Sequence, residues 1–109
     1  MATNYKILGQ TGDASANDVG LYTVPASTET IVSTIVVCNR EAADNTFRIA
    51  VKENGGSVAN EDYLAYDTTI SANDTITLTL GITIDATDVI SVGASDANVS
   101  FSAFGSEIS

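Results

Sequence analysis

Apolar and polar residues alternate along most of this chain, and β-branched or aromatic side chains fill most of the apolar positions. This pattern is typical of strands that bury one face, because successive side chains of a strand point to opposite sides. The alternation predicts about eight strands, at residues 5–8, 21–24, 30–39, 47–52, 63–66, 75–84, 89–92 and 99–104. Gly81 interrupts one of these runs and predicts a bend or bulge within it.

The strand expected over residues 30–39 departs from simple alternation. Its odd positions, such as Ile31, are expected to face the interior, and its even positions, such as Thr30, to face outward. Val36 and Cys38 are apolar residues at even positions, where this scheme calls for polar ones. We therefore expect both faces of this strand to be covered.

The next apolar run has the most regular pattern. Phe47 and Ile49 are expected to face the interior, while Arg48 and Lys52 share the outward face. Residues 53–56, with the sequence ENGG, follow directly and tolerate positive φ. A hairpin is therefore predicted at this point.

These elements define the expected fold class. The turn signals are spaced as in sandwiches and barrels, and the best helix-forming stretch, residues 41–44, would span a single turn. We predict an all-β, single-domain antiparallel β-sandwich over residues 1–109, of the jelly-roll or immunoglobulin-like (Ig-like) kind. Residues 1–20 are open to two interpretations, either as part of the sandwich or as a partly extended N-terminal arm.

Charge restricts the partners. The chain has 109 residues, with four basic residues against fourteen acidic ones and a formal net charge of −10. Nucleic-acid phosphates and anionic membrane surfaces would repel such a body, so neither is an expected partner. The apolar run at residues 35–38 is far below the roughly 20 residues of a membrane-spanning helix. The first six residues lack a secretory pattern, so we expect synthesis and retention in the cytoplasm.

Candidate chemistry is sparse. The chain has no histidine, which is the commonest general base near neutral pH and a common metal ligand. Cys38 lies in an apolar strand, where we expect it to pack as a small hydrophobic residue. Residues 13–18 begin like a calcium-binding EF-hand loop, but Asp18 and Val24 occupy the positions that require glycine and glutamate. We expect no cofactor, no metal and no enzymatic activity, although calcium or glycan binding by a loop is left open.

Five residues are candidates for contact with another subunit or with a capsid protein: Arg40, Arg48, Lys52, Tyr63 and Tyr66. The first three are among only four basic residues and would attract carboxylates of a neighbouring molecule, although ion pairs within the chain are the simpler interpretation. Tyrosine and arginine are enriched in protein interfaces. The two tyrosines could also form part of a carbohydrate platform.

Six segments together resemble a known family. They read LYTVP at 21–25, IVSTIVVCNR at 31–40, FRIAV at 47–51, YLAYD at 63–67, NDTITL at 73–78 and FSAFGSEI at 101–108. They resemble small virion structural proteins of tailed phages, notably phages of marine cyanobacteria and other aquatic bacteria. The resemblance covers nearly the whole chain. It implies a decoration or appendage subunit with a β-sandwich fold, and it carries over no catalytic or ligand residue.

This resemblance leads to a functional expectation. We expect a capsid decoration or cement subunit that binds the outer capsid surface, made in the host cytoplasm and located in the virion. Its partners would be the major capsid protein or another virion protein and further copies of itself, with a trimer preferred because such subunits often occupy three-fold positions. The alternative is a tail or head-fibre component acting as a carbohydrate-binding or receptor-binding module through Tyr63, Tyr66 and loop carboxylates.

Overall fold

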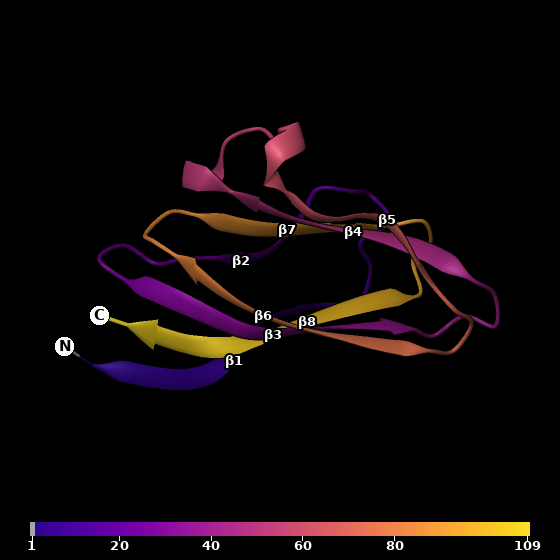
Figure 1. The fold of residues 1–109 in the computed structure, drawn as a ribbon, viewed down its shortest axis with the longest axis horizontal. Coiled ribbons are helices and arrows are strands. Elements are labelled where there is room, and N and C mark those ends of the chain that lie inside the picture. Colours follow the sequence, from indigo (N-terminus) through magenta and orange to yellow (C-terminus); the bar gives the residue numbers. More distant parts are fainter. Residues whose placement is uncertain (1) are drawn as a thin grey trace.

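Eight strands form two four-stranded antiparallel sheets in the computed structural model, which describes residues 2–109. The sheets lie face to face as two layers (Figure 1). The strands are β1 (Thr3–Thr11), β2 (Val19–Thr23), β3 (Glu29–Asn39), β4 (Asn45–Lys52), β5 (Tyr63–Ile70), β6 (Thr75–Ile84), β7 (Val89–Ala94) and β8 (Val99–Ile108). The predicted all-β sandwich with about eight strands is thus confirmed.

The strand order selects one of the two predicted sandwich types. One sheet has the order β1-β8-β3-β6 and the other β2-β7-β4-β5, so the chain changes sheet at every connection except the one from β4 to β5. An immunoglobulin-like sandwich would instead pair several sequential strands within a sheet. The interleaved order is that of an eight-stranded jelly roll.

The core lies between the sheets. Its largest fully buried side chains include Phe47 and Ile49 of β4, which face Ile35 and Phe101 of the other sheet. The rings of Phe47 and Phe101 meet edge to face with centroids 6.3 Å apart. The predicted inward positions of β4 are therefore confirmed, because a period of two places Phe47 and Ile49 on the same face.

The face assignment is wrong for the first half of β3. Ile31 was expected inside but is 38% exposed, whereas Thr30 was expected outside and is 0% exposed. The cause is a β-bulge between Val32 and Thr34, which swaps the inward and outward positions of the strand. The bulge lies opposite the predicted irregularity at Gly81, whose φ of 63° confirms that expectation.

The outer side of β3 is also less covered than expected. Val36 and Cys38 pair in register with Ser102 and Ser100 of β8 on that side, and both are half-buried. Neighbouring side chains of the same sheet shield them in part, because the second sheet packs only on the inner face. The prediction that both faces of β3 are covered is therefore wrong.

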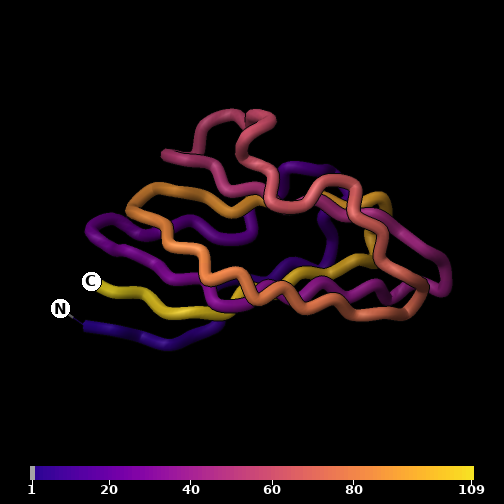
Figure 2. The backbone as a smooth tube through the Cα atoms, viewed as in Figure 1, coloured from indigo at the N-terminus to yellow at the C-terminus, as the bar shows by residue number. Residues whose placement is uncertain are grey.

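The predicted hairpin between β4 and β5 is present, but its connection is long. Asn54 and Gly55 adopt positive φ, as the turn prediction requires. They belong to a 3-10 turn, η1 (Glu53–Gly55), which is followed by a second, η2 (Asn60–Asp62), before β5 begins. This loop rises above the second sheet (Figure 2). Within the described residues, no helix is long and apolar enough to cross a membrane.

The chain ends lie side by side at one end of the first sheet (Figure 1). β1 pairs along its length with β8, and Ala2 and Ser109 exchange two backbone hydrogen bonds of 2.8 and 2.9 Å. Within the segment 1–20, residues 3–11 are thus an edge strand of the sheet. Residues 12–18 then form a loop that leads to β2.

Candidate functional site

A hollow lies on the outer face of the second sheet, and we call it the Arg48 hollow. Arg48 of β4 lies at its centre and lines two adjoining spaces with volumes of about 260 and 200 Å³. Asn17, from the loop at residues 12–18, contributes to both spaces. Tyr63 and Val58 line the second space from the β5 side. Side chains distant in sequence thus meet around one arginine.

The loop at residues 12–18 forms a wall of the hollow because it is fixed to the end of β7. The amides of Ala94 and Asn17 both donate to the carbonyl of Ala14, at 3.0 and 3.1 Å. Asn17 packs so closely over Gly93 that a Cβ at that position would lie 2.4 Å from the Asn17 side-chain oxygen. Glycine at position 93 therefore allows the loop to lie directly on the strand.

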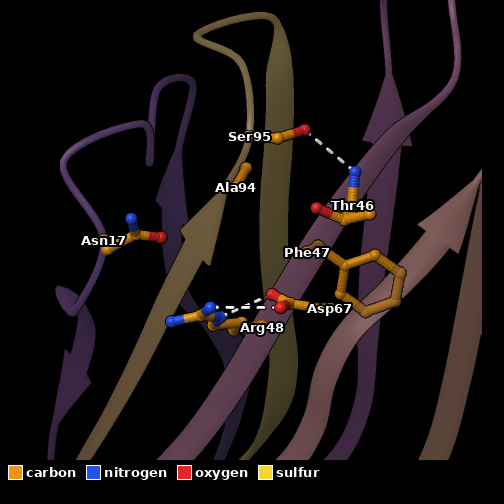
Figure 3. A pocket seen from close by; sticks show the side chains of 7 residues that line it. All are labelled: Asn17, Thr46, Phe47, Arg48, Asp67, Ala94 and Ser95. Atoms are coloured by element: carbon orange, nitrogen blue, oxygen red, sulfur yellow. Dashed lines mark hydrogen bonds and ion pairs between the residues drawn. The ribbon is translucent and has the colours of Figure 1, made fainter.

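Arg48 is held by a carboxylate and by an aromatic ring. Its Nε donates to Asp67 Oδ1 at 2.6 Å, and its Nη2 donates to Asp67 Oδ2 at 3.2 Å, a two-point contact visible in Figure 3. The guanidinium carbon also lies 4.2 Å from the centre of the Tyr66 ring. Two hydrogen bonds and a cation-π contact therefore fix the plane of the guanidinium.

The remaining groups extend the site along β4 and β5. Tyr63 and Tyr66 meet edge to face with ring centroids 4.8 Å apart. Lys52 Nζ lies 3.1 Å from Asp18 Oδ1, so it ties the end of β4 to the loop at residues 12–18. These contacts hold a row of charged and aromatic side chains in place at the surface of the molecule.

The ion pairs set the charge states of the carboxylates. The hydrogen bond from Arg48 lowers the pKa of Asp67, and the same contact raises the pKa of Arg48. The pKa of Asp18 is lowered mainly by a hydrogen bond from Ser91 and further by Lys52. Asp67, Asp18 and Arg48 are therefore ionised at neutral pH, and the positive charge of Arg48 has an adjacent negative one.

Four of the five predicted contact residues come together here: Arg48, Lys52, Tyr63 and Tyr66. Arg48 and Lys52 do share the outward face of β4, but each pairs with a carboxylate of the same chain. Arg40 lies elsewhere. Its Nη2 donates to the carbonyls of Gly12 and Ala97, at 2.6 and 3.2 Å, and so fastens two loops together.

Sequence reasoning missed Asp67, Asn17 and Asp18. Asp67 reaches Arg48 because β5 bulges there, with Asp67 at a φ of 48° and a shift of register between Phe47 and Ile49. Residues 15–18 read SAND, a sequence of turn-forming residues that recurs at 71–74, and Asn17 and Asp18 both have positive φ. No local signal, however, places this turn over β7.

Within residues 2–109, no three His, Cys, Asp or Glu side chains gather in a group that could hold a metal ion. In the loop that resembled the start of an EF-hand, Asp13 Oδ1 accepts hydrogen bonds from the amide and the hydroxyl of Ser15, at 2.9 and 2.7 Å. The Arg48 hollow instead offers amide, hydroxyl, guanidinium and aromatic groups. These groups suit recognition by hydrogen bonds and ring contacts.

No protein-family model matches this chain, and no curated protein matches it. Among solved structures, a chain of the infectious bursal disease virus Gx strain matches 97% of this chain with 15% identity and a TM-score of 0.46. A chain of the Gt strain matches 96% of it with 10% identity and a TM-score of 0.43. This chain spans 30% and 31% of the length of those two chains.

Proposed function

We propose that this protein is a structural subunit of a virus particle, of the capsid decoration or cement type, and that the Arg48 hollow is its contact with the major capsid protein or another virion protein. The proposed role is non-enzymatic, and the site of action is the virion. The observation that carries the proposal is the gathering of Arg48, Tyr63 and Tyr66 at one exposed site. The resemblance of the sequence to small virion proteins of tailed phages supports the particle as the location.

Arginine and tyrosine are the residue types that most often dominate the binding energy of protein interfaces. Such residues contribute most when they need not be ordered during association. Arg48 meets this condition because Asp67 and Tyr66 already fix its guanidinium. Tyr66 is 57% exposed, so it retains a large surface for a partner to cover.

The overall charge indicates the character of the partner surface. All four basic side chains make hydrogen bonds or ion pairs within the chain, so the net charge of −10 is spread over a body with no free basic group among its described residues. A capsid surface that binds this body should carry basic groups around the contact. Added salt should then weaken binding to the particle, because it screens that attraction.

The first test measures how many copies of this chain a virus particle contains. Virions of the virus that encodes this chain would be purified, and the chain would be quantified against the major capsid protein by mass spectrometry. A copy number close to that of the major capsid protein supports a decoration subunit, whereas a few copies per particle point to a tail or fibre part. Absence of the chain from mature virions would refute the proposal.

The second test addresses the contact itself. Purified chain would be titrated onto particles assembled without it, with Tyr66→Ala as the test variant. We expect binding to weaken by about tenfold or more, as for a central interface tyrosine. Leu64→Ala is the control, because Leu64 is also exposed on β5, whereas the ring that contacts Arg48 and Tyr63 is that of Tyr66. Equal binding by all three proteins would place the contact elsewhere.

A second candidate function is a carbohydrate-binding or receptor-binding module of a tail or head fibre. The specific observation in its favour is that Asn17, Arg48, Tyr63 and Asp67 line adjoining hollows on a jelly roll, a fold also found in lectin domains. A glycan array probed at protein concentrations approaching millimolar would decide. Binding that Tyr63→Ala abolishes favours this module, and an array without signal rejects it.

A further inference from the structure

The outer face of the first sheet, on the side of the molecule opposite the Arg48 hollow, is almost free of charge. In-register pairing places these side chains on it: Thr3, Tyr5, Ile7 and Gln10 of β1; Ser100, Ser102, Phe104, Ser106 and Ile108 of β8; Glu29, Ile31, Thr34, Val36 and Cys38 of β3; and Thr75, Thr77, Thr79 and Thr83 of β6. We call this surface the uncharged face. Among these described positions Glu29 alone is charged, and it lies at the end of β3.

The apolar part of this face lies toward the end where the chain termini meet. A groove of about 360 Å³ there is lined by Tyr5, Lys6, Ile31, Phe104, Gly105 and two serines, Ser33 and Ser106. Tyr5 is 84% exposed, and Ile7 and Ile31 are also exposed. Lys6 does not bring a free charge, because its Nζ lies 3.3 Å from Glu107 Oε1. Large apolar side chains grouped on a sheet face commonly mark an interaction surface.

We infer that the uncharged face is the surface through which two copies of this chain associate. A basic partner would bind best to an acidic surface of this chain, and the uncharged face is not acidic. A second copy, in contrast, carries the same net charge of −10. Two such bodies repel each other wherever their carboxylates meet, and the uncharged face lets them touch without burying like charges.

The symmetry of the proposed association follows because both copies use the same face. A surface that meets its own equivalent forms a two-fold, isologous contact, which is the commonest symmetry of soluble oligomers. In this arrangement the projecting Tyr5 ring of each copy packs against the groove of the other. The inference therefore commits to a dimer, in place of the trimer expected from the resemblance to decoration proteins.

The dimensions of the face agree with a reversible dimer. Its longest strands have nine to eleven residues. With a rise of about 3.3 Å per residue and a strand spacing of about 4.8 Å, four such strands present roughly 600 Å². Standard interfaces bury about 800 Å² on each partner. We therefore expect a small interface whose association depends on protein concentration.

The test is the mass of the full chain in solution, measured by sedimentation equilibrium up to millimolar concentration. We expect a monomer–dimer equilibrium that tightens when salt is raised from about 50 to about 500 mM, because salt screens the repulsion between the two acidic bodies. Tyr5→Ala should raise the dissociation constant about tenfold or more. Tyr66→Ala, the matched exposed tyrosine on the opposite sheet, should leave it unchanged. Tyr5 is mostly exposed, so its variant should fold normally, as circular dichroism would verify.

Several results would overturn the inference: a monomer at every concentration, a trimer, or an association that weakens with salt, as expected if Arg–carboxylate pairs held the copies together. Dissociation by Tyr66→Ala but not by Tyr5→Ala would also overturn it. The measurement uses no virus particle. A failure here consequently leaves the proposed docking through the Arg48 hollow standing, and a failure of docking leaves the dimer standing.

Discussion

Tyr22 of β2 donates its phenolic hydrogen to Glu107 of β8 over 2.5 Å, and this hydrogen bond crosses from one sheet to the other. The same hydroxyl lies 2.8 Å from the Thr30 hydroxyl, which is fully buried on β3. Glu107 accepts a second contact from Lys6 on its other oxygen. A polar cluster thus closes the end of an otherwise apolar core, and each of its members depends on the others.

Removal of the Tyr22 hydroxyl tests how much this cluster contributes to the free energy of unfolding. Tyr22→Phe keeps the buried ring but leaves the Thr30 hydroxyl and one Glu107 oxygen without this partner. Hydrogen bonds to charged groups typically contribute about 1.5–3 kcal/mol, so we expect the free energy of unfolding to fall by about that amount. Urea denaturation would measure it as a lower midpoint with an unchanged slope. Tyr5→Phe, at an exposed tyrosine, is the control, and an equal loss in both variants would show that the cluster contributes little.

The same contact predicts how stability changes in alkali. Burial, together with the hydrogen bond to Glu107, raises the pKa of Tyr22 from 10.0 to about 12. A group whose pKa is raised on folding contributes stability that is complete below its unfolded pKa and is lost as pH rises through its folded pKa. We therefore expect stability to decline between about pH 10 and pH 12. Titration by phenolate absorbance should show a late component that Tyr22→Phe removes; an unchanged titration curve in that variant would contradict the assignment.

The two-layered fold could be predicted from the sequence because apolar and polar residues alternate along most of the chain. Phe47 and Ile49 alternate with polar residues, and this pattern alone places them in the core. Ile31 shows where the prediction of buried positions from alternation fails. The odd–even scheme placed Ile31 inside, but the bulge at Ser33 swaps the faces, and a bulge opposite Gly81 can be located only once the strands are paired.

The candidate site was predictable in part for a related reason. Arg48 and Lys52 can be assigned to one face from their spacing, but their partners Asp67 and Asp18 depend on strand register and on the path of a loop. The structural role of Asn39 could not be predicted from the sequence either. It lies buried at the end of β3, where its side-chain amide donates to the carbonyls of Ala43 and Ser71. Long-range pairing of this kind leaves no local pattern in a sequence.

Alanine substitutions in two strands test the burial that the fold assigns. Ile49 is completely buried, so Ile49→Ala should lower the free energy of unfolding by about 2–5 kcal/mol. Leu78 of β6 faces the core but is only half-buried, so Leu78→Ala should cost about half as much. Thr77 is exposed, and Thr77→Ala should stay within about 0.5 kcal/mol. Urea denaturation would rank the three variants, and a loss for Leu78→Ala as large as that for Ile49→Ala would mean that β6 is more deeply covered.

Gly9 tests the close approach of the two sheets at β1. A Cβ at this position would lie 2.1 Å from the carbonyl oxygen of Leu21 on β2, which is backbone and cannot move without shifting the strand. Gly9→Ala must therefore push β1 away from β2, and overpacking of this kind typically costs about 1–3 kcal/mol. Gly12→Ala is the matched control three residues later, because no atom lies within 4 Å of its Cβ position. Hydrogen exchange should show faster exchange of β1 amides in Gly9→Ala than in Gly12→Ala, and identical protection in the two variants would mean that the strands do not approach this closely in solution.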